Sequence, residues 1–159
     1  MPKAYASRNL RNHKMPILRE IEVTYRFRSI KCDIIGKKLE SPELVYTTFN
    51  FLKFETKEKF IVINLNNQHG IMNYETVATG TVNSIKLRPC EVLRTAVMLN
   101  APAVILVHNH PSGYPDPSNS DIAITNKIIE CGKLLGIDVL DHIIIGESSF
   151  VSLKQRELL

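Results

Sequence analysis

The feature that most constrains the fold is a run of five apolar residues at 103–107 that ends directly in His108-Asn109-His110. A short run with no polar interruption predicts a strand covered on both faces, because a strand with one wet face alternates apolar and polar residues. Side chains two positions apart in an extended backbone point the same way. We therefore expect two imidazoles side by side at the end of a buried strand, with Asn109 pointing away from them.

A loop rich in turn-forming residues follows the two histidines and leads into a helix predicted over residues 118–135. Its bends lie at Pro111, Gly113, Pro115 and Pro117. Ser118 and Asp121 have a spacing close to that of a capping box, in which an N-cap serine and an acidic residue three positions later satisfy backbone N–H groups. The loop brings the start of this helix back to the strand end, so Asp121 comes within reach of His108 and His110.

Together these three side chains predict a catalytic metal site. Two neutral imidazoles and one carboxylate, with a position left for water, are a ligand set of catalytic zinc. Such an ion lowers the pKa of its water toward ~7 and polarises a carbonyl group. Ser118 lies one helical turn before Asp121, and its hydroxyl has two compatible expected roles. It caps the helix, and it donates a hydrogen bond to the oxyanion of a tetrahedral intermediate.

The remaining pattern predicts an α/β protein with a mixed β-sheet flanked by helices, because strands and helices alternate without a strict βαβ rhythm. Helices are expected over residues 41–51, where Ser41-Pro42 offers an N-cap and a first-turn proline, and over residues 89–100. On the first of these helices we expect the core to be faced by Leu44, Val45, Thr48, Phe49 and Leu52. Strands are expected over residues 20–29, 60–65, 71–79, 82–87, 103–107, 137–145 and 150–153.

Charge divides the chain into a leader and a single domain. Residues 1–38 hold ten Lys and Arg against three acidic residues, a net charge of +7, whereas residues 39–159 hold ten against thirteen, a net charge of −3. We therefore expect a basic leader over residues 1–40, with an edge strand at 20–29, and one domain over residues 41–159. Such a leader contacts nucleic acid or an acidic partner, or else is simply solvated. The edge strand leaves open a homodimer in which two copies pair.

Cysteine usage and hydropathy point to the cytoplasm. Cys32, Cys90 and Cys131 are an odd number of widely spaced thiols with no Cys-x-x-Cys pair, which favours reduced thiols over disulfides. No apolar run approaches the ~20 residues of a membrane span, and the basic start of the chain lacks the apolar segment of a signal peptide. We expect a cytoplasmic protein with no membrane partner.

The histidine segment also resembles a known motif. His108-x-His110, seven residues, Ser118, two residues and Asp121 match the JAMM motif of MPN-type zinc metallopeptidases. A likeness to the RadC branch of that family spans about residues 41–153 and includes HNHPSG, GIDVLDHIIIG, TGTVN at 79–83 and RPCEV at 88–92. The resemblance implies an MPN (cytidine-deaminase-like) fold, with one zinc ion per chain on the two histidines and Asp121. It also implies that Ser118 lies near the reacting carbonyl.

The same motif has an upstream glutamate as general base, which takes a proton from water and returns it to the leaving nitrogen. The resemblance points to Glu58, two residues before Phe60 in KEKFIVINL, with Glu55 and Glu75 as weaker alternatives. Lys59 departs from the family pattern, because peptidases of the family usually have the acid directly before the apolar residues of the strand. The alternative is that Glu58 is an exposed residue in a charged turn, in which case the site binds metal without hydrolysis.

Another histidine, His142, lies in the predicted strand at 137–145 and matches the RadC pattern but not the JAMM ligands. We expect it to be hydrogen-bonded in the core or behind the metal ligands, with Asp141 orienting it or one of the ligands. His13 and His69 lie in segments expected to be surface loops.

These features favour a zinc-dependent metallohydrolase of the JAMM type, which cleaves a peptide or isopeptide amide in a peptide or protein substrate. In this interpretation zinc-bound water attacks the carbonyl, Glu58 transfers the proton and Ser118 steadies the oxyanion. One alternative from another class is a metal-binding interaction module without catalysis. A second is a metal-dependent nuclease or DNA-repair protein, which the basic leader keeps open.

The other readings are weaker. The literal string HNH says little, since HNH nucleases are named for residues scattered over a ββα element. A nucleobase deaminase lacks support because the H-x-E and P-C-x-x-C signature is absent, and the serine spacing disfavours a two-histidine, one-carboxylate iron oxygenase.

Longer RadC-like proteins resemble this chain only in their C-terminal half. Their N-terminal helix-hairpin-helix part does not fit into the leader, so we expect a short stand-alone form. The association of RadC-like proteins with DNA repair therefore gains little support from this sequence.

Overall fold

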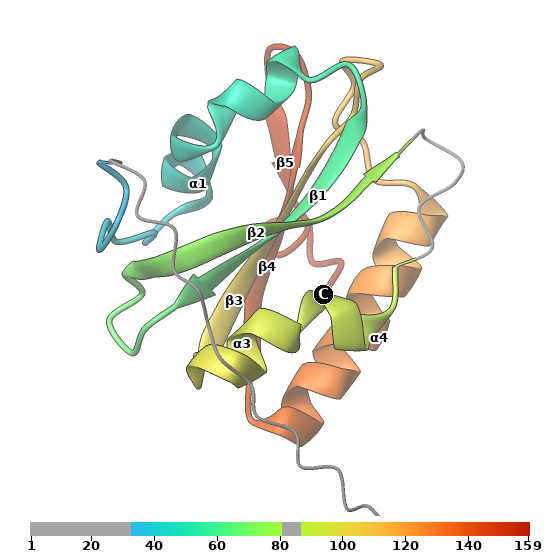
Figure 1. Ribbon diagram of the computed structural model, residues 1–159. Helices are drawn as coiled ribbons and strands as arrows, with labels where there is room; N and C mark the ends of the chain where they lie inside the picture. The colour runs from blue at the N-terminus through green and yellow to red at the C-terminus, as the bar shows by residue number, and fades with distance from the viewer. Residues whose placement is uncertain (1–32, 81–86) are drawn as a thin grey trace, which may run out of the picture. The chain divides into compact units, whose positions relative to one another are not determined.

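A computed structural model of the chain describes residues 33–80 and 87–159 (Figure 1). The strands expected over residues 20–29 and 82–87 lie outside these ranges, apart from Leu87, as does most of the basic leader. Within the described ranges no helix is both long and apolar enough to cross a membrane.

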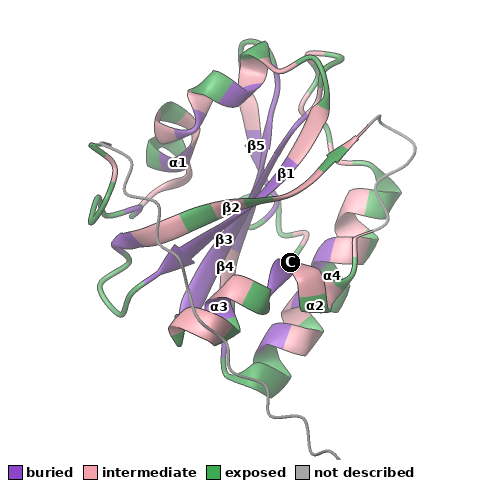
Figure 2. Cartoon of the chain, viewed as in Figure 1, coloured by how far each residue is buried: buried purple, intermediate pink, exposed green. Residues whose placement is uncertain are grey.

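Five strands form one mixed sheet. They are β1 (Glu58–Leu65), β2 (Ile71–Gly80), β3 (Ala103–Asn109), β4 (Asp138–Ile145) and β5 (Phe150–Ser152). Their order is β2-β1-β3-β4-β5, and only β3 and β4 run parallel. All seven residues of β3 are buried, as the apolar run predicted, and this strand lies along the middle of the sheet (Figure 2).

Helices cover both faces of the sheet, which confirms the predicted α/β class. One face carries α1 (Pro42–Thr48) and the short 3₁₀ helix η1 (Asn50–Phe54). The other carries α2 (Pro89–Val92), α3 (Arg94–Leu99) and α4 (Asn119–Leu135). α4 connects the parallel strands β3 and β4, which is the usual crossover for a parallel pair. It therefore begins at the carboxyl end of β3, where ligand sites of such sheets lie.

Strand β1 shows how the two-residue period sorts side chains between the layers. Ile61 and Ile63 belong to the core under α1 and η1, whereas Phe60 and Val62 pack with the helices of the other face. Because alternate side chains of a strand share a face, Glu58 lies on the face of Phe60, toward α4.

The local signals at helix ends are confirmed. Ser41 caps α1 with its side chain, and Ser118 caps α4 in a complete capping box. Asn100 and Gly136 end α3 and α4 in the left-handed conformation, with φ of 51° and 70°. The serines pair with N–H groups that a helix start leaves free, and the left-handed residues end the helix while bonding its last carbonyl groups.

Some predicted faces and boundaries differ from the structure. Leu44 is 38% exposed, although it was expected to face the core. The buried stripe of this segment is Val45, Phe49 and Leu52, and Leu44 is turned about 100° away from Val45 around the helix. The helix expected over residues 89–100 is two helices, α2 and α3, separated by the buried Leu93.

Candidate metal centre

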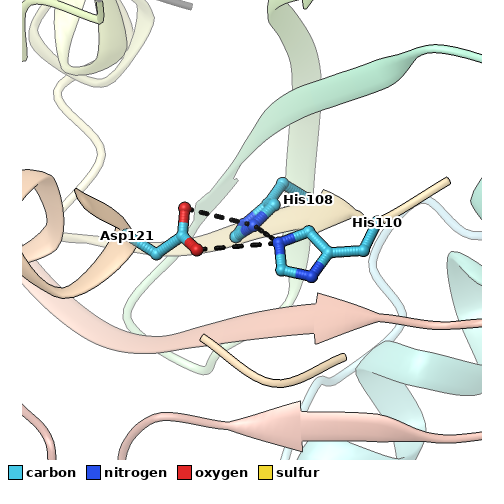
Figure 3. A group of neighbouring side chains, drawn as sticks. All are labelled: His108, His110 and Asp121. Carbon is cyan, nitrogen blue, oxygen red and sulfur yellow. Dashed lines mark hydrogen bonds and ion pairs between the residues drawn. The ribbon is translucent and has the colours of Figure 1, made fainter. Parts of the chain in front are cut away.

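Three side chains converge where β3 ends and α4 begins (Figure 3). His108 is the second-last residue of β3, His110 follows the strand in the loop, and Asp121 is on the first turn of α4. His108 is fully buried, while the side chains of His110 and Asp121 are each 15% exposed. The group is therefore closed on the core side and open to solvent on the other.

The spacing of the donor atoms suits a single cation. The Nε2 atoms of His108 and His110 are 2.9 Å apart, and the Asp121 oxygens lie 3.5 and 3.6 Å from them. One ligand atom from each residue lies within 4.8 Å of the others. In a tetrahedral zinc site with metal–ligand distances near 2.0–2.2 Å, neighbouring ligand atoms are about 3.3–3.6 Å apart. The three residues thus fit such an ion with small adjustments.

The hydrogen bond behind His110 determines which of its nitrogens faces the group. His110 Nδ1 lies 2.8 Å from the backbone oxygen of Tyr114. A carbonyl oxygen only accepts, so Nδ1 carries the proton and Nε2 of the neutral ring presents a lone pair. A lone pair directed at another imidazole nitrogen and at a carboxylate calls for a cation between them, either a proton or a metal ion.

The electrostatics of the group reflect this crowding. Burial lowers the pKa of His108 to about 4, so this ring is neutral at physiological pH. The carboxylate of Asp121 holds the pKa of His110 above its usual value. Burial opposes ionisation of Asp121, yet contacts with His110, His108 and Ser118 hold its pKa well below the usual range. The Asp121 carboxylate is thus ionised at physiological pH and faces the Nε2 atoms of His108 and His110.

Ser118 positions the carboxylate. Its hydroxyl donates to Asp121 Oδ2 at 2.6 Å, and its backbone N–H donates to the same oxygen at 2.8 Å. The Asp121 N–H in turn donates to Ser118 Oγ at 3.2 Å. The predicted capping box is therefore present, and it aims the carboxylate at the histidines. The oxyanion role of Ser118 stays a prediction.

Of the three candidate glutamates, Glu58 is the one that the fold brings to this group. Burial and then the charge of Asp121 raise the pKa of Glu58, and Glu58 in turn helps to raise the pKa of His110. Glu55 is engaged elsewhere in an ion pair with Lys59 at 2.7 Å, and Glu75 in one with Arg94. The expected alternative of an exposed Glu58 does not hold, because the residue is half-buried.

Asn109 points away from the two histidines, as its position in the strand predicted. Its Oδ1 accepts from the Lys59 N–H at 2.8 Å, and its Nδ2 donates to the Lys57 oxygen at 3.2 Å. These two bonds hold the backbone on both sides of Glu58 against β3. The departure at Lys59 is consistent with this arrangement, since Lys59 lies on the opposite face from Glu58.

Comparison with known proteins identifies the family. A family model for the RadC-like JAB domain matches residues 39–158. The chain belongs to the RadC-like JAB domain family. The UPF0758 protein of Methanosarcina mazei is 48% identical over 121 residues, which are 76% of this chain and 53% of that protein. The UPF0758 protein of Alkaliphilus metalliredigens is 40% identical over 147 residues, which are 90% of this chain and 62% of that protein.

Membership makes the described part a JAB domain, which is a metal-dependent hydrolase-like domain, and its mixed sheet between helices is consistent with the MPN fold. A further relative, the UPF0758 protein of Bacillus pumilus, is 44% identical over 105 residues, or 66% of this chain and 47% of that protein. The chain spans about half the length of the curated relatives it matches.

The side chains of His142 and Thr125 in this JAB domain lie behind His108, on the core side of the ligand group. His142 on β4 is fully buried, as expected, and its ring contacts that of His108 with the centroids 4.8 Å apart. Asp141 does not contact that ring: it accepts from the His142 N–H and from Ser152, on the opposite side of the strand. Thr125 was not identified from the sequence, although its place four residues after Asp121 puts both on one side of α4.

Proposed function

We propose that this JAB domain is a zinc-dependent hydrolase of the JAMM type that cleaves a peptide or isopeptide amide. The observation that carries the proposal is the convergence of the His108 and His110 Nε2 atoms on the carboxylate of Asp121, with one side open to solvent. Bound there, a zinc ion supplies an acidified water and a polarised carbonyl. The three residues are its proposed ligands.

Glu58 is the proposed proton carrier. Its carboxyl group is half-buried beside the ligand set, and its raised pKa brings it closer to the pH at which a group both accepts and returns a proton efficiently. Ser118 holds Asp121 in place through its hydroxyl, and turning that hydroxyl outward would direct its proton to a substrate oxyanion.

A cavity next to His110 supports binding of a polar substrate. It has a volume of about 260 Å³ and is lined by Lys53, His110, Pro111, Ser112, Gly113 and Glu147. Opposite charges at Lys53 and Glu147 and the backbone groups of the loop suit the polar main chain of a peptide. An amide bond next to His110 would therefore have its flanking residues in this cavity.

The first test is the metal content of the purified full chain by plasma mass spectrometry. Wild type and Glu58→Gln are expected to hold about one zinc per chain, and His110→Ala is expected to lose it, because His110 is a proposed ligand and Glu58 is not. Absence of metal from all three proteins, even after zinc is added, would contradict the proposal.

The second test is hydrolysis of peptide and isopeptide libraries by the zinc-loaded protein. Loss of the proton carrier in Glu58→Gln is expected to slow cleavage by roughly 10²–10⁴-fold. Glu75→Gln is the matched control, since Glu75 pairs with Arg94 instead. Equal rates in the two variants would show that Glu58 is not the proton carrier, and absence of cleavage by zinc-loaded wild type would favour a metal-binding module without catalysis. If the protein cleaves DNA but no amide, and Glu58→Gln loses this DNA cleavage, the nuclease interpretation would be favoured.

A further inference from the structure

A chain of hydrogen bonds through His142 and Thr125, here called the relay, runs behind His108, on the side away from the Asp121 carboxylate and His110. His108 Nδ1 lies 2.7 Å from His142 Nε2, and His142 Nδ1 lies 2.6 Å from Thr125 Oγ1. The Thr125 hydroxyl in turn donates to the backbone oxygen of Asp121 at 2.5 Å. His108, His142 and Thr125 are all fully buried. The chain therefore crosses from β3 through β4 to α4 without reaching solvent.

The last bond of this chain sets the direction of every other one. A backbone oxygen only accepts, so the single Thr125 hydroxyl proton is committed to Asp121. Thr125 Oγ1 must then accept from the Nδ1–H of His142. A neutral imidazole has one N–H, so His142 Nε2 is an acceptor and receives the Nδ1–H of His108. The remaining nitrogen, His108 Nε2, carries a lone pair that faces the ligand group.

Both rings are held in the neutral form that this assignment requires. Both rings lie entirely out of solvent, and burial disfavours the charged imidazolium. The Phe60 ring also packs against both, stacked on His108 at 5.9 Å between centroids and edge-on to His142 at 5.3 Å. Because the Phe60 ring offers no hydrogen-bond partner, the ring nitrogens in the relay bond only to each other and to Thr125.

We propose that His142 and Thr125 are positioning residues that fix the tautomer of His108, keeping its proton on Nδ1 and its Nε2 lone pair directed at the metal. This inference rests on the proposed function, because it assumes that His108 is a ligand of the proposed metal ion. Asp121 stands at both ends of the arrangement, since its backbone oxygen anchors the relay and its carboxylate faces His108 Nε2. Helix α4 thus controls two ligands at once.

The proton assignment is measurable without any metal. In the zinc-free full chain, long-range ¹H–¹⁵N correlation spectra distinguish protonated from unprotonated ring nitrogens. We expect His108 and His142 each to show a protonated Nδ1 and an unprotonated Nε2. A proton on His108 Nε2 would overturn the inference, whatever the protein binds.

Zinc affinity, measured by competition with a chelator, tests the role of the relay. Thr125→Val keeps the side-chain shape but removes the acceptor, so His142 is free to donate from Nε2 and drive the His108 proton onto its own Nε2. We expect zinc to bind about 10–100-fold more weakly, the usual effect of losing a partner behind a metal ligand. Thr125→Ser, which keeps the hydroxyl, is expected to bind nearly as tightly as wild type.

Thr95→Val is the matched control. Thr95 Oγ1 accepts from Asn64 on the same face of the sheet but touches none of the relay residues. Its substitution removes one partly buried hydrogen bond and is expected to leave zinc affinity unchanged. Equal affinities in Thr125→Val and Thr95→Val would overturn the inference.

A second pair of variants keeps the test informative if Thr125→Val does not fold. His142→Gln offers an oxygen to His108 and an N–H to Thr125, so it preserves the direction of the relay, whereas His142→Leu abolishes it. Gln is expected to retain more zinc affinity than Leu, and equal values would overturn the inference. Failure of the proposed function looks different: wild type then binds no zinc, while the ring protons remain as assigned.

Discussion

Gly146 packs so closely against Gly113 that a Cβ atom at position 146 would overlap the Gly113 carbonyl oxygen and press on the ring of Pro115. The same carbonyl accepts the Glu147 N–H at 3.0 Å, and the Gly113 N–H donates to the His110 oxygen at 2.9 Å. The end of β4 and the loop after His110 thus fit together only because residue 146 has no side chain. That loop also carries the Tyr114 carbonyl that orients the His110 ring.

Gly146→Ala is therefore expected to displace the loop and weaken zinc binding by roughly tenfold or more, as for other changes behind a metal ligand. The matched control is Gly136→Ala, because position 136 has φ of 70° and open space around it. The control costs about 1–2 kcal/mol of backbone strain but leaves the ligands in place. Chelator competition checks both variants, and equal zinc affinities would show that the loop does not position His110.

The two serine N-caps allow capping to be separated from ligand positioning. Ser118→Ala and Ser41→Ala each remove a cap, which typically costs about 1 kcal/mol of stability. Only Ser118 also donates to the carboxylate of Asp121, so only Ser118→Ala is expected to lower zinc affinity as well. Urea unfolding and zinc titration of both proteins check this. A similar loss of affinity in Ser41→Ala would mean that helix stability, and not the hydroxyl, controls the site.

The buried His108 predicts a stability that depends on pH in the zinc-free protein. Its folded-state pKa of about 4 lies below the ordinary value of 6.5, so the unfolded chain binds more protons between these values. The stability due to this residue is present above pH 6.5 and is lost as the pH falls toward 4. From about pH 7.5 to pH 5 the loss is roughly 2 kcal/mol.

His110 acts in the opposite sense, since its raised pKa gives stability that is present below 6.5 and lost as the pH rises. The effect of His108 is therefore isolated by comparing wild type with His108→Asn in urea unfolding at both pH values. Wild type is expected to lose about 2 kcal/mol more than the variant on acidification. Parallel losses in the two proteins would contradict a neutral, buried His108.

Local patterns in the sequence predicted what depends on neighbouring residues. The apolar run at 103–107 predicted the buried β3, and Ser118 with Asp121 predicted the cap of α4. The two-residue period also placed His108 and His110 on one side and Asn109 on the other. Leu44 was placed wrongly because two adjacent residues of a helix point about 100° apart, and the apolar pattern alone does not show which of the two is buried.

The contacts behind the ligands could not be predicted in the same way. Thr125 and His142 are 17 residues apart and meet only because β4 lies parallel to β3, with His142 opposite Leu106. The partner of His110 is a backbone oxygen, that of Tyr114, which any residue type provides. Such contacts depend on register and on the path of a loop, so residue types alone do not reveal them.

The side chain of Asn109 holds the backbone on both sides of Glu58, through the Lys59 N–H and the Lys57 carbonyl. Asn109→Ala leaves these groups without their partner, at a cost of about 1–3 kcal/mol, and releases Glu58 from its place beside the ligands. Hydrolysis is expected to fall about tenfold while zinc affinity stays near that of wild type. Asn64→Ala is the matched control, because Asn64 is equally buried but bonds to Asn73 and Thr95. Rates measured on folded protein that fall equally in both variants would show that Asn109 supports the fold and not the position of Glu58.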